Sequence, residues 1–330
     1  MDKILTIAIP VYNMEKYLKR CLDSVADPSV AEDVEVLIIN DGSTDNSLAI
    51  AEEYAKDHKN FVVIDKENGG WGTAINRGIK EARGKYFRNL DSDDWFKAGS
   101  LAEVVNELKK GIDSDLILTP RTETSEGGES KFISYPEHLC GRTMTLEEYL
   151  EATGIKPNCP IHSLMVKTAI LQENNIQILP KYYTDIEYTF TTLLYVRTIH
   201  IIPIDFYQYY LGREGQSVSM DSYFKHLDDH AAVAQRLSTL YMVHKDKMPA
   251  PLRAFLQETA LGRIQWTYYL LMVHPRKKTA IDRQKLLKEY DRSLKKEAPE
   301  LYRASNKIKR MGIPYIWLWR KTRINLFYFR

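Results

Sequence analysis

The first third of the chain alternates between short apolar runs and segments whose apolar residues recur at helical spacing. Ser43-Thr44-Asp45 supplies capping residues in front of the second helical segment. Strands that alternate with helices of this length predict βαβ units, and hence an α/β fold with a mostly parallel sheet. The runs that predict buried strands are Leu5–Ile9, Val34–Ile39, Phe61–Ile64 and Lys85–Leu90. The helical spacings are Leu18, Cys21, Leu22 and Val25, then Leu48, Ile50, Ala51, Tyr54 and Ala55.

Polar residues follow each of these predicted strands. The carboxyl ends of parallel strands meet at one edge of a sheet, and ligands bind in the crevice beyond that edge. The sequence therefore predicts a ligand site built from four short segments: Tyr12-Asn13, Asp41-Gly42, Asn68-Gly69-Gly70 and Asp91-Ser92-Asp93-Asp94.

The remainder of the chain has a different pattern. Residues 120–160 are rich in Gly, Ser, Glu and Pro, and they predict loops around an exposed turn at 122–130. From about Met220 to about Leu301 the apolar spacing becomes helical. With 330 residues, the chain has the length of two domains or of one large domain with an extension.

Composition excludes several classes of protein. Hydrophobic residues make up 44% and charged residues 27%, which are ordinary globular values. No apolar run approaches the roughly 18 residues of a membrane-spanning helix. The start of the chain, Met1–Ile4, lacks the features of a secretory signal, so we expect none. The three cysteines, Cys21, Cys140 and Cys159, are too few and too scattered for a disulfide framework or a zinc cluster, and they predict a reducing cytoplasm.

Charge is unevenly distributed along the chain. The net charge is +2, but residues 301–330 carry eight basic side chains and no acidic one, so the first 300 residues sum to −6. Tyr, Trp and Phe residues are interleaved with the basic residues, which predicts peripheral contact with an anionic membrane. The alternative is a helix that packs its aromatic side chains into a core. Nucleic-acid binding has no other support in the chain, and we expect none.

The acidic segment at 91–94 predicts a metal site. Three carboxylates within four residues repel one another and attract a cation, and oxygen ligands favour a hard ion such as Mg²⁺ or Mn²⁺. The alternative is a helix N-terminus decorated with acids. Asp41 and the glycines at 69, 70 and 72 are equally ambiguous when taken singly, because a strand end, a turn and a helix cap use the same residues.

Order and spacing combine these signals into a specific pattern. The pattern consists of the segments Ile7–Glu15, Cys21–Val25, Val36–Ser47, Asn68–Gly70 and Leu90–Asp94, in this order. With these segments the chain closely resembles the family 2 glycosyltransferases over about residues 4–120. The resemblance implies a GT-A fold, a nucleotide-sugar donor (usually a UDP-sugar), a divalent cation (Mn²⁺ or Mg²⁺) and inverting transfer to a glycan or lipid-linked acceptor in surface polysaccharide synthesis.

The resemblance also implies roles for individual residues. Asp91 and Asp93 correspond to the family's Asp-x-Asp motif, with Asp91 near the ribose and Asp93 on the metal, and Asp94 is a further metal candidate because the triple acid leaves the register open. The residues that correspond to the family's contacts with the nucleotide base are Pro10, Tyr12, Asn13 and Asp41. Further contacts with the nucleotide-sugar donor are expected from Asn68, Gly70, Asn76 and Ser92.

The catalytic base is expected from a later acidic motif. An inverting transfer needs a carboxylate that takes the proton of the acceptor hydroxyl. Asp185 matches the aspartate of the family's Glu-Asp pair, whereas Thr184 stands where a glutamate is usual. Glu187 is near but out of register. The alternative interpretation of this segment is a helix start that Thr184 or Asp185 caps.

A second departure concerns the donor diphosphate. Many family members read Ala-Arg-Asn-x-Gly where this chain has Ala74-Ile75-Asn76-Arg77-Gly78, so the diphosphate contact of that arginine is in doubt. In a helix Arg77 points about 200° away from position 75. Arg213 is another candidate for the diphosphate, and His162 for the metal or the acceptor side, although a solvated arginine and a structural histidine are the common cases.

The resemblance extends to the end of the catalytic region. Residues 209–219 resemble the Tyr-rich strand and Ser-x-Ser loop that close such domains. We therefore expect a GT-A catalytic domain over residues 1–218 and a mostly helical extension over 219–330. Two rival functions remain: a nucleotidyltransferase, which needs a basic Gly-rich loop after the first strand where this chain has Pro10–Asn13, and an inactive nucleotide-sugar-binding subunit that supports a partner.

Overall fold

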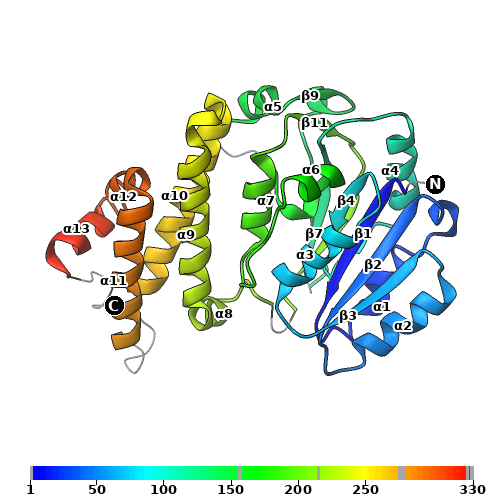
Figure 1. Ribbon diagram of the computed structural model, residues 1–330, viewed down its shortest axis with the longest axis horizontal. Coiled ribbons are helices and arrows are strands. Elements are labelled where there is room, and N and C mark those ends of the chain that lie inside the picture. The colour runs from blue at the N-terminus through cyan, green and yellow to red at the C-terminus, as the bar shows by residue number, and fades with distance from the viewer. Residues whose placement is uncertain are drawn as a thin grey trace. The chain divides into compact units, whose positions relative to one another are not determined.

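The computed structural model describes residues 3–125, 127–154, 158–213, 216–273, 280–324 and 327 (Figure 1). The chain forms two compact units. The first consists of Met1–Thr153, Pro157–Pro180 and Thr184–Gln216. The second consists of Gly154–Lys156, Lys181–Tyr183 and Ser217–Arg330.

An eight-stranded sheet forms the centre of the first unit. Its strand order is β3-β2-β1-β4-β10-β6-β11-β9. The four strands β3, β2, β1 and β4 are mutually parallel, as the sequence predicts, whereas β10 runs antiparallel to both β4 and β6. The strands are β1 (Leu5–Val11), β2 (Val34–Asp41), β3 (Phe61–Lys66), β4 (Tyr86–Asn89), β6 (Leu116–Leu118), β9 (Thr143–Thr145), β10 (Leu164–Lys167) and β11 (Thr198–Ile201).

Helices pack against this sheet and leave its central strands inaccessible to solvent. Every residue of β1 and β2 is buried, which explains why these strands are continuous apolar runs and not alternating ones. Helix α3 packs on both β1 and β2. The helices of the first unit are α1 (Leu18–Asp23), α2 (Ser47–Asp57), α3 (Trp71–Glu81), α4 (Ser100–Lys109), α5 (Leu146–Thr153), α6 (Thr168–Glu173) and α7 (Asp185–Leu193).

A second, four-stranded sheet corrects the loop prediction for residues 120–160. Its order is β5-β12-β7-β8, formed by β5 (Trp95–Phe96), β12 (Tyr207–Leu211), β7 (Arg121–Ser125) and β8 (Ser130–Ile133). Strand β9 and helix α5 also fall within the range that was expected to be loops. The prediction was wrong because these strands are polar: β8 is almost entirely exposed, so it carries no apolar run.

The second unit is helical, as the spacing after Met220 predicts. Its helices are α8 (Met220–Lys225), α9 (Leu227–His244), α10 (Ala250–Met272), α11 (Ala280–Glu297), α12 (Pro299–Ser305) and α13 (Tyr315–Thr322). Helix α11 packs on α9, α10 and α12, and α9 packs on α10. In the described ranges, each helix is either too short or too polar to cross a bilayer.

The basic tail divides between packing and exposure. Tyr315 and Trp319 of α13 are buried, and Arg320 forms an ion pair with the buried Asp291 of α11, with Nε and Oδ1 2.7 Å apart. Trp317 is 43% exposed. One face of α13 is therefore structural and another is open to solvent, while Tyr328, Phe329 and Arg330 lie outside the described residues.

Candidate active site

Asn13, which the sequence predicts to contact the nucleotide base, joins the loop after β1 to the loop after β2. Asn13 has a left-handed backbone (φ 54°), a conformation that asparagine tolerates well. Its Oδ1 accepts a hydrogen bond from the Thr44 amide at 2.8 Å, and its own amide donates to the Ser43 hydroxyl at 3.1 Å. Tyr12 is 48% exposed, so its ring is available to a ligand.

The carboxylate of Asp41 organises the next loop. This residue ends β2 and is buried. It accepts hydrogen bonds from the amides of Gly69 and Gly70, at 2.9 and 2.7 Å, and it forms an ion pair with Lys66. Its backbone oxygen accepts from the Asn68 side chain at 2.9 Å. The Asp41 carboxylate thus accepts from three donors of the protein itself, two of them in the 68–70 loop, and one acceptor position of a carboxylate remains.

Three other residues that the sequence predicts to contact the nucleotide-sugar donor are buried in the protein or hydrogen-bonded to it. Pro10 is buried within β1, and Ser92 is buried in the acidic loop. The side chain of Asn76 both donates to and accepts from the backbone of Ile178, at 2.8 Å each. Asn76 therefore braces the segment before α7, and its donor contact remains a prediction.

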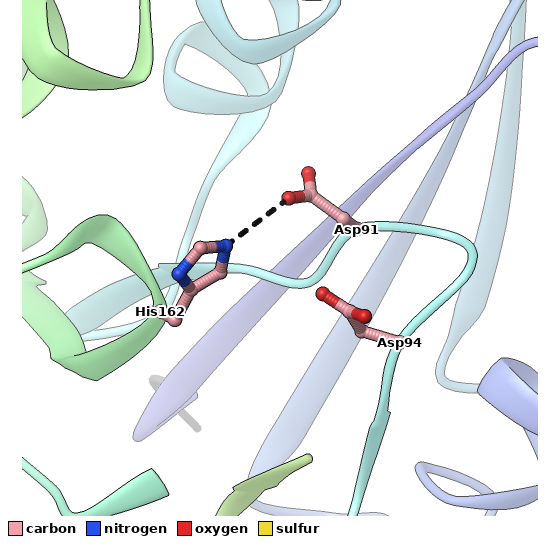
Figure 2. Close-up of side chains that lie close together, drawn as sticks. All are labelled: Asp91, Asp94 and His162. Atoms are coloured by element: carbon pink, nitrogen blue, oxygen red, sulfur yellow. Dashed lines mark ion pairs between the residues drawn. The ribbon is translucent and has the colours of Figure 1, made fainter. Parts of the chain in front are cut away.

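Two of the predicted carboxylates converge with a histidine just beyond β4. One ligand atom from each of Asp91, Asp94 and His162 lies within 4.8 Å of the others (Figure 2). The dashed line in Figure 2 joins His162 Nε2 to Asp91 Oδ2, which are 3.8 Å apart. The other oxygen of Asp91 accepts from the indole of Trp71 at 2.9 Å.

Burial, followed by repulsion from neighbouring carboxylates, raises the pKa values of Asp91 and Asp94. Burial raises the pKa of Asp91 to about 7, and the negative charge of Asp93 adds to the shift. The pKa of Asp94 also lies well above its usual range, again because of burial and then because of Asp93. Such a site favours a cation, since a positive charge would stabilise both ionised carboxylates.

Asp93 and Asp94 have different partners. Asp94 is buried, and its two oxygens accept from the Tyr207 hydroxyl at 2.6 Å and the Tyr210 amide at 2.8 Å. Asp93 forms an ion pair with Arg213, which follows β12. The structure thus ties Asp94 to β12 and Asp93 to Arg213, two residues beyond the end of that strand, and it places Asp93 outside the converging set.

His162 is held in a neutral form. Its ring stacks on Tyr209 with centroids 4.1 Å apart, in the turn before β10. Burial lowers the pKa of His162 to about 3, and the positive charges of Arg121 and Arg88 lower it further. A neutral imidazole offers a lone pair to a metal ion.

Asp185 begins α7 and is exposed. Its charge contributes to the raised pKa of Asp91, so the two carboxylates lie within electrostatic range of each other. Burial raises the pKa of Tyr209, and the charges of Asp94, Asp91, Asp93 and Asp185 raise it further. Glu187 is buried and accepts from the Leu179 amide at 3.1 Å, so it supports the start of α7.

These side chains fit a divalent cation. Two carboxylates and one neutral imidazole each bring a ligand atom within 4.8 Å of the others, and oxygen with imidazole ligands is a set that first-row divalent metals accept. The second residue of the expected motif, Asp93, adds negative charge beside them.

Sequence reasoning missed several residues that hold this site. Trp71 and Lys66 contact Asp91 and Asp41, but nothing in their spacing marks them. Arg88 did carry a signal, because it interrupts the apolar run of β4. It is fully buried, donates to the His162 carbonyl, and is paired with no acidic group in the part of the chain that the structure describes. Burial lowers its pKa to about 10.

The α/β sheet, with an acidic group beyond β4, has the architecture of the GT-A fold class. The family model of the glycosyl transferase family 2 matches residues 6–170, and the chain belongs to this family. Ile75, which departs from the common pattern, is a fully buried core residue of α3. Arg77 forms an ion pair with Glu81, its Nε 2.9 Å from a carboxylate oxygen, and so does not replace the missing arginine.

Individual proteins agree with the family assignment. The chain is 30% identical over 224 residues to the poly(ribitol-phosphate) beta-glucosyltransferase of Bacillus spizizenii. This alignment covers 66% of this chain and 33% of that protein. It is 38% identical over 97 residues to the glycosyltransferase GlyA of Streptococcus pneumoniae, covering 29% and 14%. The matched part therefore spans at most about a third of these relatives.

A solved structure supports the fold over nearly the whole chain. TarS 1–349 of S. aureus, determined in complex with UDP-GlcNAc, superimposes with a TM-score of 0.65 at 18% identity. The superposition covers 97% of this chain and 88% of that one. At this identity the likeness concerns the fold.

Proposed function

We propose that the protein is a metal-dependent glycosyltransferase that moves a sugar from a nucleotide-sugar, a UDP-sugar foremost, to an acceptor hydroxyl with inversion. The observation that carries this proposal is the gathering of Asp91, Asp94 and His162, with Asp93 and Asp185 nearby, at the carboxyl edge of a nucleotide-type sheet. Family membership gives the same reaction class.

On the donor side, we assign binding to the loops after β1, β2 and β3. The exposed Tyr12 ring is available to stack on the base, and Asp41 retains one acceptor position for a base N–H. Asp41 also holds Gly69 and Gly70 in place, so the donor would meet a loop that is already ordered.

At the reacting centre, Asp91, Asp94 and His162 would hold the divalent cation, with Asp93 beside them. Held there, Mn²⁺ or Mg²⁺ would supply the positive charge that stabilises a departing nucleoside diphosphate. Asp185 is exposed, so an acceptor can approach it, and its carboxylate takes the proton of the attacking hydroxyl. The domain division at residue 218 remains our prediction for the catalytic part.

We propose a surface polysaccharide or a lipid-linked glycan as the acceptor. One relative is named a poly(ribitol-phosphate) beta-glucosyltransferase and another a chondroitin synthase, so two similar proteins are named for repeating polymers. We further propose that the enzyme works in the cytoplasm, with its basic tail in peripheral contact with the inner face of the plasma membrane.

A donor screen tests the reaction class. UDP-, GDP- and dTDP-sugars are added to the full chain with Mn²⁺, with Mg²⁺ or with EDTA, and thermal stabilisation and donor hydrolysis are measured. We expect one UDP-sugar to stabilise the protein and to be hydrolysed slowly, both only with metal. Metal-dependent binding without hydrolysis or transfer to any acceptor would favour the inactive subunit, and absence of binding would contradict the proposal.

A further inference from the structure

A basic cavity lies in the second unit. It has a volume of about 260 Å³ and is lined by Lys288, Asp291, Arg292, Lys295, Tyr302 and Arg323. Four of these residues lie three or four positions apart on α11 and therefore share one face of that helix. The first-unit residues discussed above take no part in it.

The positive charge of this cavity is uncompensated. The carboxylate of Asp291 is already bound by Arg320, at 2.7 Å, and by the Tyr268 hydroxyl, at 2.5 Å. Within the described ranges, Lys288, Arg292 and Lys295 have no acidic group within 4 Å, and neither has Arg323. Like charges that line one cavity repel each other, so an anion would stabilise the arrangement.

The backbone fixes the place of Arg323. It ends α13 in a left-handed conformation (φ 61°), a position that glycine or asparagine usually takes. Its amide donates to the Trp319 carbonyl at 2.8 Å, and its guanidinium lies 4.5 Å from the centroid of the Trp319 ring. The backbone and the indole contact thus keep this exposed arginine beside the cavity.

A smaller pocket of mixed lining adjoins the basic one. It shares Lys288 and Arg323 with the larger cavity, and its other lining residues are Leu271, Gln284, Leu287 and Trp319. Its volume is about 80 Å³. A ligand with an anionic group next to a hydrocarbon group would match the basic and the apolar residues of the two pockets.

We propose that this paired cavity binds the phosphate of an anionic membrane lipid, with the first carbons of the lipid tail against Leu271, Leu287 and Trp319. The larger cavity lies below the roughly 300–1,000 Å³ of pockets that enclose whole small molecules, so it suits a headgroup. The inference rests on the membrane contact proposed above and gives it a specific site.

Exposed apolar side chains of the same unit support a membrane surface. Ile324, directly after Arg323, is 51% exposed, and Ile313 and Trp317 are 44% and 43% exposed. Tryptophan with basic residues is typical of proteins that bind at the headgroup level of a bilayer. Truncating the tail is a poor test, because Trp319 and Arg320 are packed into the unit; point substitutions in the full chain are preferable.

The test compares two charge-matched double variants of the full chain. Lys288→Gln with Lys295→Gln removes two cavity charges, whereas Lys285→Gln with Lys296→Gln removes two exposed charges of the same helix that line neither cavity. Binding to vesicles of phosphatidylglycerol in phosphatidylcholine is measured by sedimentation. We expect the first variant to bind at least tenfold more weakly and the second to stay within about threefold of the wild type. Circular dichroism and donor binding establish that both variants are folded.

Each other outcome contradicts a specific part of the inference. Equal loss in both variants would mean diffuse attraction by net charge, without a site. Equally tight binding of soluble glycerol 3-phosphate, lost in the cavity variant, would make the ligand a free phosphate compound and not a lipid. Failure of the wild type to bind vesicles would overturn both the membrane contact and the site, while donor hydrolysis, measured without vesicles, would still report on the glycosyltransferase function.

Discussion

Individual carboxylates of the site differ in what surrounds them, although the sequence presents them as one acidic run. Asp91 faces His162 and Trp71, Asp94 is held by Tyr207 and Tyr210, and Asp93 pairs with Arg213. The role of each carboxylate therefore depends on a different element, and single substitutions are expected to have separable effects.

The first prediction concerns Asp93. We expect Asp93→Asn to weaken Mn²⁺ binding at least tenfold, because it removes a negative charge beside the converging ligands. Isothermal calorimetry with Mn²⁺ alone measures this. The control is Arg213→Gln, which breaks the same ion pair from its other side and should leave Mn²⁺ affinity intact. Equal losses in the two variants would assign the effect to the ion pair and remove Asp93 from metal binding.

The second prediction concerns Asp185. Asp185→Asn should lower turnover by about 10²–10⁴-fold with little change in donor affinity, because a general base acts only during transfer. The charge also lies in the first turn of α7, where an acid stabilises a helix by about 0.3–1 kcal/mol. Asp228→Asn, in the first turn of α9, controls for that effect. Near-normal transfer by the Asp185 variant would exclude this residue as the base.

At the scale of elements, α3 and the segment before α7 approach each other unusually closely. A Cβ atom on Gly72 would lie 2.1 Å from the Leu179 carbonyl oxygen. Asn76, one turn further along α3, binds both backbone groups of Ile178, and Glu187 of α7 accepts from the Leu179 amide. These ties order the residues that lead to the helix carrying Asp185.

This close approach leads to the third prediction. Gly72→Ala should lower the free energy of unfolding by about 1–3 kcal/mol, because the added methyl group has no space. Gly262→Ala is the matched control: Gly262 lies within α10 with nothing within 4 Å of its Cβ position, so the same change should stabilise by about 0.5–1 kcal/mol. Urea unfolding measures both. A neutral or stabilising effect at position 72 would show that the segment at 179 yields easily.

At the scale of the whole molecule, the helical unit contains a buried histidine whose ring nitrogens have no hydrogen-bond partner among the described residues. His230 of α9 is fully buried, and in the described part of the chain neither ring nitrogen has a partner. Its ring stacks on Tyr183 with centroids 4.0 Å apart, and Tyr223 packs at its edge. Burial lowers the pKa of His230 to about 3, with further contributions from the charges of Arg263 and His226.

The fourth prediction follows from that pKa. An unfolded histidine has a pKa of about 6.5, so below this pH the unfolded chain binds a proton that folded His230 does not, and stability falls as the pH falls toward 3. At pH 5 the loss from this residue is about 2 kcal/mol. His230→Phe keeps a stacking ring and should remove that part of the loss in urea unfolding at pH 7 and pH 5. The exposed His138→Gln should behave as the wild type; an unchanged profile in His230→Phe would contradict the prediction.

The sequence by itself determined the α/β fold, the parallel order of its first strands and the family. Strand burial and helix amphipathicity are local periodic properties, and the polar residues at strand ends are placed by topology as soon as the strands are parallel. The same reasoning located Asp41, Asp91 and Asp94 at one edge of the sheet, and it singled out His162 without favouring it.

Only the tertiary structure decided which side chains meet. His162 is 71 positions from Asp91 along the chain, and Arg88 reaches its carbonyl from another strand. The polar hairpin of β7 and β8 left no apolar signal because one of its strands is exposed. The sequence of the basic tail was compatible with a membrane-facing surface and with a packed helix. The structure shows both features, since Arg320 forms an ion pair with the buried Asp291 whereas Arg323 and Trp317 are exposed to solvent. Contacts between distant residues depend on packing geometry, which no local pattern along the chain encodes.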